Sequence, residues 1–316
     1  MKKKLLSFLL TICMVLSLLP TAALAMGIAT TVTVAGQTLN STNPYLVNGT
    51  AANTGTLGTG GCTAHFDANT GTLTLQDATI TSATEDAIHT DQADLIVVLN
   101  GINTVSSEKA KGGAFVTISG GNLTFKGTGS LTATGDYAIY AFDDLIVESG
   151  TIVANGTTAG LSTNSGKITI SGGTVTGTAT DAAGYGIGKD WGGTLGLEIT
   201  GGVVTAKNTG IGGKAIGAAE TNTTHDIYAA EDAAGTGEAL ANITDLTNFA
   251  KPYVRFELGK TISGKVTKDG SAPVEGASVQ IKKGAAPFGA PATTKADGTY
   301  TTQTLPQDTY TAEVTK

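Results

Sequence analysis

The middle of the chain repeats a pattern of apolar and polar positions that is typical of short β-strands. In each repeat two apolar residues flank one other residue, and a third apolar residue follows five or six positions later. The six sets are Leu73/Leu75/Ile80, Leu95/Val97/Ile102, Leu123/Phe125/Leu131, Leu145/Val147/Ile152, Ile168/Ile170/Val175 and Leu197/Ile199/Val204. A small and a large apolar residue then follow, as Ala87-Ile88, Ala114-Phe115, Ala138-Ile139, Gly160-Leu161, Gly186-Ile187 and Gly210-Ile211. Because alternation with a period of two indicates strands, each unit predicts three of them.

Turn residues and a regular spacing make these units one repeat. Pairs such as Asn100-Gly101 and Gly201-Gly202 separate the first strand from the second, and such residues accept a positive φ at little steric cost. The units begin 22, 28, 22, 23 and 29 residues apart, with the extra length outside the apolar sets. A constant strand core with variable loops is typical of a solenoid. We therefore predict an all-β protein with about six rungs of a parallel β-solenoid over residues 73–217.

A row of antiparallel hairpins is the competing interpretation. The segment from Ile199 to Val203 would by itself be read as a hairpin turn. However, the third apolar strand has no role in a simple hairpin, and the period is about half that of a propeller blade. The repeat therefore favours the solenoid.

The segments on both sides of the repeat are expected to cap its two ends. Unpaired strand edges at the ends of a solenoid invite aggregation unless they are covered. Residues 26–72 alternate like strands at Thr31–Val34 and Cys62–Phe66, which predicts an N-terminal β cap. Residues 218–259 form a capping segment or linker, in which Tyr253–Glu257 alternates as a closing strand.

The first 25 residues have the pattern of a secretory signal peptide. Three lysines at positions 2–4 precede an apolar run from Leu5 to Leu19, and Ala23-Leu24-Ala25 provides the small residues that a signal peptidase accepts. The apolar run is shorter than the roughly 20 residues that span a membrane. We expect cleavage after Ala25, export, and a location outside the cell or on the bacterial surface, with no membrane span after cleavage.

Charge and cysteine content narrow the possible partners and cross-links. Loss of the signal peptide removes three lysines and leaves 16 basic against 26 acidic residues, a net charge of −10. Nucleic acid and anionic lipid are poor partners for such a surface. Cys13 leaves with the signal peptide, so Cys62 has no partner for a disulfide and is expected to be a small buried residue.

The segment after residue 260 changes to a different pattern. It contains Gly264-Lys265-Val266, Pro273-Val274 before Gly276-Ala277-Ser278-Val279, Asp297-Gly298-Thr299-Tyr300, and Leu305-Pro306 before Tyr310. These motifs resemble the carboxypeptidase regulatory-like domains, which implies a small Ig-like, prealbumin-type β-sandwich over residues 260–316. The sequence departs from the family at Gln307–Thr309, where a glycine is usual, and we expect the module to be C-terminally incomplete. Because residues 260–316 contain no asparagine, a Lys–Asn isopeptide bond is not available, and we expect a spacer.

The repeat region carries a second resemblance, over roughly residues 29–217. The opening Leu39–Tyr45, the entry from Asp67 to Leu75 and the recurring Ile-Ser-Gly-Gly-Thr-Val unit are similar to exported surface proteins of anaerobic Gram-positive bacteria that are described as carbohydrate-binding. The resemblance implies a right-handed parallel β-helix and extracellular glycans or cell-wall polysaccharide as partners. These motifs are of low complexity.

A polysaccharide lyase or hydrolase on a β-helix is the serious alternative function. Such chemistry requires clustered acids, or Ca²⁺ beside a basic residue. Arg255 is the single arginine and lies outside the repeat, and acids such as Asp136, Asp143 and Asp144 occupy positions where turn chemistry explains an aspartate. The spacing of His and Cys matches no metal site. We therefore predict no catalytic residue, metal or cofactor, and keep a purely structural stalk as a second alternative.

Exposed aromatic residues with neighbouring acids are the candidates for sugar binding, because an aromatic ring stacks on the C–H face of a pyranose. They are Tyr140, Tyr185, Trp191, Asp144 and Asp190. The position after the third-strand apolar residue reads His89, Val116, Tyr140, Ser162, Gly188 and Gly212 along the repeat, which predicts a tyrosine shelf beside a glycine-floored depression. Trp191 alone would equally cover an edge of the stack. Threonine-rich outer faces resemble ice-binding solenoids, but strand propensity explains them better.

Overall fold

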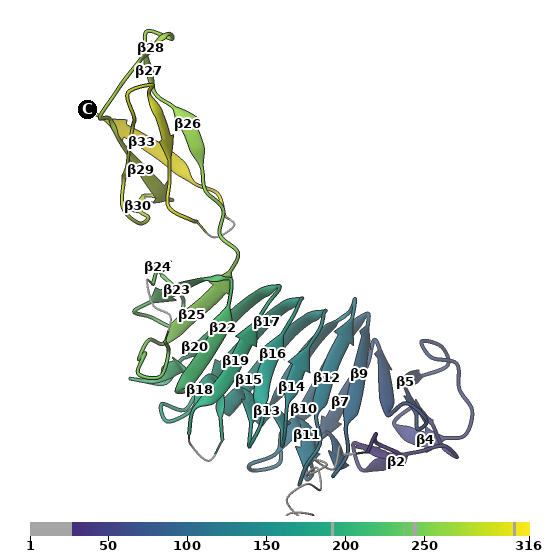
Figure 1. Ribbon diagram of the computed structural model, residues 1–316. Coiled ribbons are helices and arrows are strands. Elements are labelled where there is room, and N and C mark those ends of the chain that lie inside the picture. The colour runs from purple at the N-terminus through teal and green to yellow at the C-terminus, as the bar shows by residue number, and fades with distance from the viewer. Residues whose placement is uncertain (1–26, 191–192, 237, 242–244, 306–307) are drawn as a thin grey trace, which may run out of the picture.

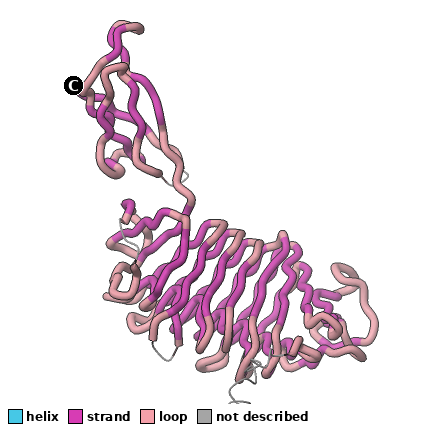
Figure 2. Tube along the Cα trace, viewed as in Figure 1, coloured by secondary structure: helices cyan, strands magenta, loops and turns pink. Residues whose placement is uncertain are grey.

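A computed structural model describes residues 27–316, except 191–192, 237, 242–244 and 306–307. The described residues form strands and turns and contain no helix, so none there is long and apolar enough to cross a membrane (Figure 2). The predicted signal peptide with its cleavage site, Trp191, and Pro306 lie outside the described residues.

The repeat region is a parallel β-solenoid of about six turns, as its spacing predicted (Figure 1). One face stacks the first strand of each rung, which are β6 (Thr72–Gln76), β9 (Leu95–Asn100), β12 (Leu123–Gly127), β14 (Leu145–Val147), β16 (Lys167–Ile170), β19 (Leu195–Ile199) and β22 (Ala219–Thr223). A second face stacks β7 (Thr79–Ser82), β10 (Ile102–Ser107), β13 (Ser130–Ala141), β15 (Thr151–Thr163), β17 (Thr174–Ala179) and β20 (Val203–Asn208). The third face stacks β8 (Ile88–Asp91), β11 (Gly113–Ile118), the second halves of β13 and β15, β18 (Tyr185–Lys189) and β21 (Lys214–Ile216).

Pairing between rungs rules out the hairpin interpretation. Leu75 lies in β6, which pairs with β9 in parallel, and Ile80 lies in β7, which pairs with β10 in parallel. Each strand therefore hydrogen-bonds to its counterpart in the next rung rather than to its own neighbour in sequence.

Apolar side chains form continuous columns inside the solenoid. One column runs Leu95, Leu123, Leu145, Ile168 and Leu197, and another runs Ile88, Phe115, Ile139, Leu161, Ile187 and Ile216. All of these side chains are buried. Phe115 and Phe125 meet edge to face with ring centroids 5.1 Å apart, which ties two faces together. Burial of these thin aliphatic layers is the main favourable contribution to folding.

Two apolar residues that the pattern assigned to the interior lie outside. Ile102 is 76% exposed, and the interior position next to it belongs to Asn103, which is 1% exposed. Ile211 is 98% exposed because it lies in the turn closed by the Gly213 N–H and the Gly210 carbonyl, and Ile216 takes the interior position instead. The prediction was wrong at both positions because the rungs differ in loop length, and apolarity alone does not identify the residue that points inward.

Register also differs in the first rung. Leu73 pairs with Val97 rather than with Leu95, which is a displacement of two residues. Ile80 pairs with Val105, which lies three residues after Ile102 and two after the interior Asn103. A shift of two residues keeps every side chain on the same face of the sheet. The sequence pattern therefore fits both registers.

Antiparallel strands lie at both ends of the stack. At the N-terminal end, β1 (Val32–Val34) pairs with β2 (Gln37–Leu39) and with β8, while β5 (Cys62–Asp67) pairs with β6 and with β3 (Tyr45–Val47), which also pairs with β4 (Thr50–Ala52). At the other end, β25 (Tyr253–Glu257) lies between β20 and β23 (Asp226–Ala230), which pairs with β24 (Ala239–Leu240). The antiparallel pairing ends the parallel stack at these strands.

The C-terminal module stands at the end of the solenoid that carries β23 and β25 (Figure 1). Its strands are β26 (Ser263–Lys265), β27 (Thr267–Lys268), β28 (Ala272–Pro273), β29 (Ser278–Lys283), β30 (Ala286–Pro287), β31 (Ala292–Thr293), β32 (Thr299–Thr301) and β33 (Thr311–Thr315). Tyr228 of the cap packs in one apolar cluster with Ile281, Phe288 and Leu305 of the module. Lys283 reaches back to Glu238 at 3.1 Å.

The interior asparagine provides a test of the register. The Asn103 amide accepts from the Ala78 N–H at 3.0 Å and donates to the carbonyls of Asn100 and Ser130 at 3.0 and 3.1 Å. We expect Asn103→Ala to lower the free energy of unfolding by about 2–4 kcal/mol, because buried backbone groups lose their partners. Ile102→Thr, one residue away and exposed, should change it by less than about 0.5 kcal/mol. Denaturant titration measures both, and the opposite order would contradict the register.

Candidate functional site

On the third face of the solenoid, one column of stacked residues changes from large side chains to small ones along the stack. Register aligns His89 with Val116, Val116 with Tyr140, Tyr140 with Ser162 and Ser162 with Gly188, as the sequence suggested. The column does not continue to Gly212. Instead, the N–H of Gly217 donates to Ile187, which places Gly217 beside Gly188.

A second column lies beside the first and contains two tyrosines. Tyr137 aligns with Ala159, and Ala159 aligns with Tyr185. Since strands in a sheet are about 4.8 Å apart, the two tyrosines stand about 10 Å apart with a small residue between them. The register shifts between Gly135 and Tyr137, at a β-bulge or similar irregularity. Bulges re-aim side chains, and this one precedes the first tyrosine.

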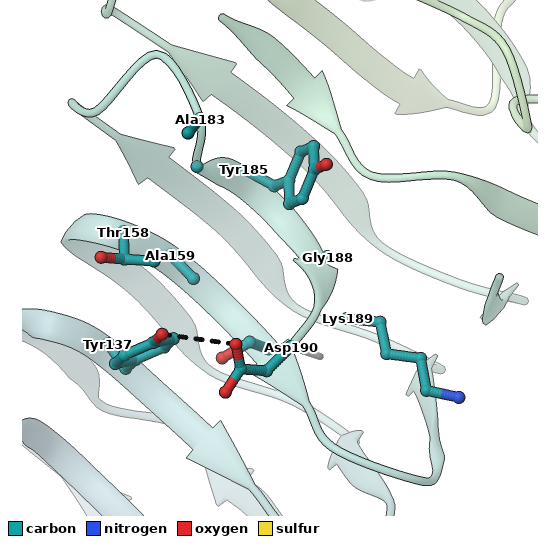
Figure 3. Close-up of a pocket in the computed structure, with 10 residues that line it drawn as sticks. Tyr137, Thr158, Ala159, Ala183, Tyr185, Gly188, Lys189 and Asp190 are labelled. Carbon is teal, nitrogen blue, oxygen red and sulfur yellow. Dashed lines mark hydrogen bonds between the residues drawn. The ribbon is translucent and has the colours of Figure 1, made fainter. Parts of the chain in front are cut away.

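Between these tyrosines lies an open cavity of about 170 Å³, which we call the tyrosine slot (Figure 3). Its lining comprises Tyr137, Thr158, Ala159, Ser162, Ala183, Gly184, Tyr185, Gly188, Lys189 and Asp190. Gly188 makes room for the second tyrosine, because a Cβ at Gly188 would lie 2.8 Å from Cβ and Cδ2 of Tyr185. The slot therefore has aromatic ends and a floor of small residues.

Asp190 links the slot to a second cavity of about 150 Å³, which we call the side pocket. The Tyr137 hydroxyl donates to Oδ1 of Asp190 at 3.3 Å, and both residues line both cavities (Figure 3). The other residues of the side pocket are Asp86, Lys111, Gly113, Val116 and Tyr140. Tyr137 and Tyr140 meet there with ring centroids 5.9 Å apart and planes at 72°.

The phenols of Tyr137 and Tyr140 stay protonated at neutral pH. Burial raises the pKa of Tyr140 to about 12, and the negative charge of Asp190 adds to the effect. Burial, and then the same carboxylate, also raise the pKa of Tyr137. Both tyrosines therefore offer a neutral ring, and Tyr137 offers an O–H donor.

The candidates from the sequence divide into two groups. The structure brings Tyr140, Tyr185 and Asp190 together around the two cavities, whereas Trp191 lies outside the described residues. Asp144 lies elsewhere, where its carboxylate accepts the N–H of Lys167 at 2.8 Å. It forms a ladder with its neighbours, since the N–H of Asn122 donates to Asp94 and that of Asp144 donates to Asn122.

Tyr137 is the residue of this candidate site that sequence reasoning missed. Its signal was present, because Tyr137 and Tyr185 each stand two residues before an apolar residue of the third strand, Ile139 and Ile187. The sequence analysis compared only the position directly after this apolar residue in each repeat. A comparison of the position two residues before it would also have found Tyr137 and Tyr185.

Comparison with known proteins identifies one part of the chain. Residues 261–316 match the family model of the carboxypeptidase regulatory-like domain. No curated protein matches the chain, and no solved structure matches it. The fold and the site thus define a parallel β-solenoid with an open, tyrosine-lined groove, joined to a carboxypeptidase regulatory-like domain. Within the described ranges, no three or more His, Cys, Asp or Glu residues gather as a metal site.

The raised pKa values give a test of the electrostatics. A phenol whose pKa is higher in the folded chain than its unfolded value of about 10 holds its proton more tightly when folded. For Tyr140 this contribution to stability is complete below about pH 10 and is lost as the pH rises from about 10 to about 12. We expect Asp190→Asn to lower the pKa of Tyr140 and Tyr137, because a repelling charge is removed.

Alkaline titration followed by tyrosinate absorbance measures this change. Asp143→Asn is the control, since the Asp143 carboxylate accepts from Gly121 and Ser165 outside the two cavities. An Asp190→Asn curve identical to the parent would contradict the proximity of this carboxylate to the phenols.

Proposed function

We propose that the chain is a non-catalytic binding protein of the cell exterior whose tyrosine slot binds extended glycans. The observation that carries this proposal is the pair Tyr137 and Tyr185, held in one column two rungs apart with Ala159 between them. Rings separated by about 10 Å leave, after their own thickness, room for about one pyranose. Aromatic residues supply a large apolar contact area, while Thr158 and Asp190 supply hydrogen-bonding groups beside it.

The openness of the slot supports a polymeric ligand. The slot is open to solvent, so a linear glycan can extend beyond the residues that hold one sugar. Stacking and a few hydrogen bonds give weak affinity, with a Kd on the order of 10⁻⁴ M, or about −5 kcal/mol. Many copies on one surface multiply such an affinity.

Sequence features support a role outside the cell. The signal-peptide pattern of residues 1–25 predicts export, and the net charge of −10 after its removal disfavours nucleic acid and anionic lipid as partners. In this proposal the C-terminal module is a spacer that carries the solenoid away from its point of attachment.

The non-catalytic part of the proposal has its own test. Asp190 is the one carboxylate among the described residues that line the slot, and glycoside hydrolysis generally uses two. We expect no release of reducing or unsaturated ends from plant, mucin and cell-wall polysaccharides incubated with the purified chain. Ends that appear with the parent, and disappear with Asp190→Asn, would establish a polysaccharide-degrading enzyme instead.

Binding itself is tested with the two slot tyrosines. A glycan array on the chain lacking residues 1–25 identifies a ligand, and calorimetry then compares variants. We expect Tyr137→Ala and Tyr185→Ala each to weaken binding by about tenfold, because each removes one aromatic wall. Ile102→Ala is the control, since this exposed side chain lies in β10 on the second face of the solenoid and does not line the slot. Unchanged affinity in both tyrosine variants, with melting temperatures preserved, would remove the slot as the binding site.

A further inference from the structure

The side pocket has walls of a different character from the slot. The rings of Tyr137 and Tyr140 stand at 72° to each other, so they present an aromatic corner rather than a flat shelf. Asp190 closes the corner, because its charge acts on both phenols and its carboxylate accepts from Tyr137. Two rings at a steep angle with a carboxylate beside them are the arrangement that proteins use to hold an alkylammonium group.

Of the two carboxylates that line this pocket, Asp86 is balanced by a neighbouring lysine. Oδ2 of Asp86 pairs with Lys109 at 2.9 Å, and its Oδ1 accepts the N–H of Gly113 at 2.8 Å. Lys111 also lines the pocket, but it is exposed, and the bond that it forms with the Asp136 carboxylate comes from its backbone N–H.

Asp190 is the exception. Among the described residues it forms no salt bridge, and the neighbouring Lys189 points away from it and from Tyr137 (Figure 3). Asp190 is also only partly exposed to solvent. The Asp190 carboxylate in this corner therefore has no ion-pair partner among the described residues, and a cationic ligand can supply one.

We propose that the side pocket binds an alkylammonium group, so that the chain prefers glycans that carry a free amine. This inference rests on the proposed glycan function, since Tyr137 and Asp190 line both cavities and a sugar in the slot would direct a substituent toward the pocket. An ammonium group gains attraction from both ring faces and from the carboxylate. An N-acetylated amine carries no charge and gains neither.

The test compares two oligosaccharides with the same backbone. Chitotetraose carries free amines, and tetra-N-acetylchitotetraose carries none. In mildly acidic buffer, where the amines are charged, we expect the free-amine oligomer to bind the parent about tenfold more tightly. Asp190→Asn and Tyr140→Leu should remove this preference, whereas Tyr140→Phe, which keeps the ring, and Asp143→Asn, outside both cavities, should retain it. Equal affinities in the parent, or a preference that survives Asp190→Asn, would overturn the proposal.

Choline separates this inference from the glycan proposal. Saturation-transfer NMR detects choline methyl groups bound to the parent, and Asp190→Asn should abolish the signal. If choline binds in this way and no glycan does, the ammonium pocket stands and the glycan proposal falls. If glycans bind but neither choline nor free amines are preferred, the ammonium pocket is wrong and the glycan proposal stands. A preference for free-amine sugars without choline binding assigns the pocket to the sugar amine.

Discussion

Parallel hydrogen bonding between successive rungs is the constraint on which the rest of the structure depends. It places each residue beside its counterpart one rung away, so a side chain belongs to a column as well as to a strand. Apolar columns become the core, and polar columns become the outer faces. The tyrosine slot exists because Tyr137, Ala159 and Tyr185, which are widely separated in the sequence, share one column.

Stacking of the rungs also requires hydrogen-bond partners for backbone groups at the corners, and polar side chains provide them. Turns at the corners of a rung leave backbone N–H and C=O groups that the strands do not pair, and buried groups of this kind need partners. Asn103 meets this need inside the stack, and Asn208 does so near its end, where its amide donates to Asp181 and Gly184. Asp94, Asn122 and Asp144 form a ladder on a corner. Several aspartates that resemble candidates for chemistry are therefore explained by the architecture.

The joint between the solenoid and the C-terminal module combines apolar and charged contacts. Tyr228 meets Phe288 with ring centroids 6.4 Å apart. Beside them Glu238, whose side chain is buried, receives both Arg255 at 2.6 Å and Lys283 at 3.1 Å. This buried carboxylate ties cap and module together, since one of its two cations, Arg255, lies in the cap and the other, Lys283, lies in the module.

Sequence alone determined the architecture and much of the site's composition. The period of two within strands and the 22-to-29-residue period between rungs predicted the parallel solenoid, and the motifs after residue 260 predicted the C-terminal domain. Tyr140, Tyr185 and Asp190 were selected as aromatic residues with an acid nearby in the sequence, and they line two cavities that share Asp190.

Tertiary structure alone decided the register and the partners. A shift of two residues leaves the alternation intact, so the apolar pattern did not reveal the displaced first rung. Ile102 and Ile211 were placed inside because they are apolar, whereas Asn103 is inside because its amide satisfies three backbone groups at once. Tyr137 belongs to the site because it shares a column with Tyr185 and because its hydroxyl forms a hydrogen bond with Asp190. Contacts between rungs depend on where each loop ends, and this is set by hydrogen bonds across the stack rather than by local preference.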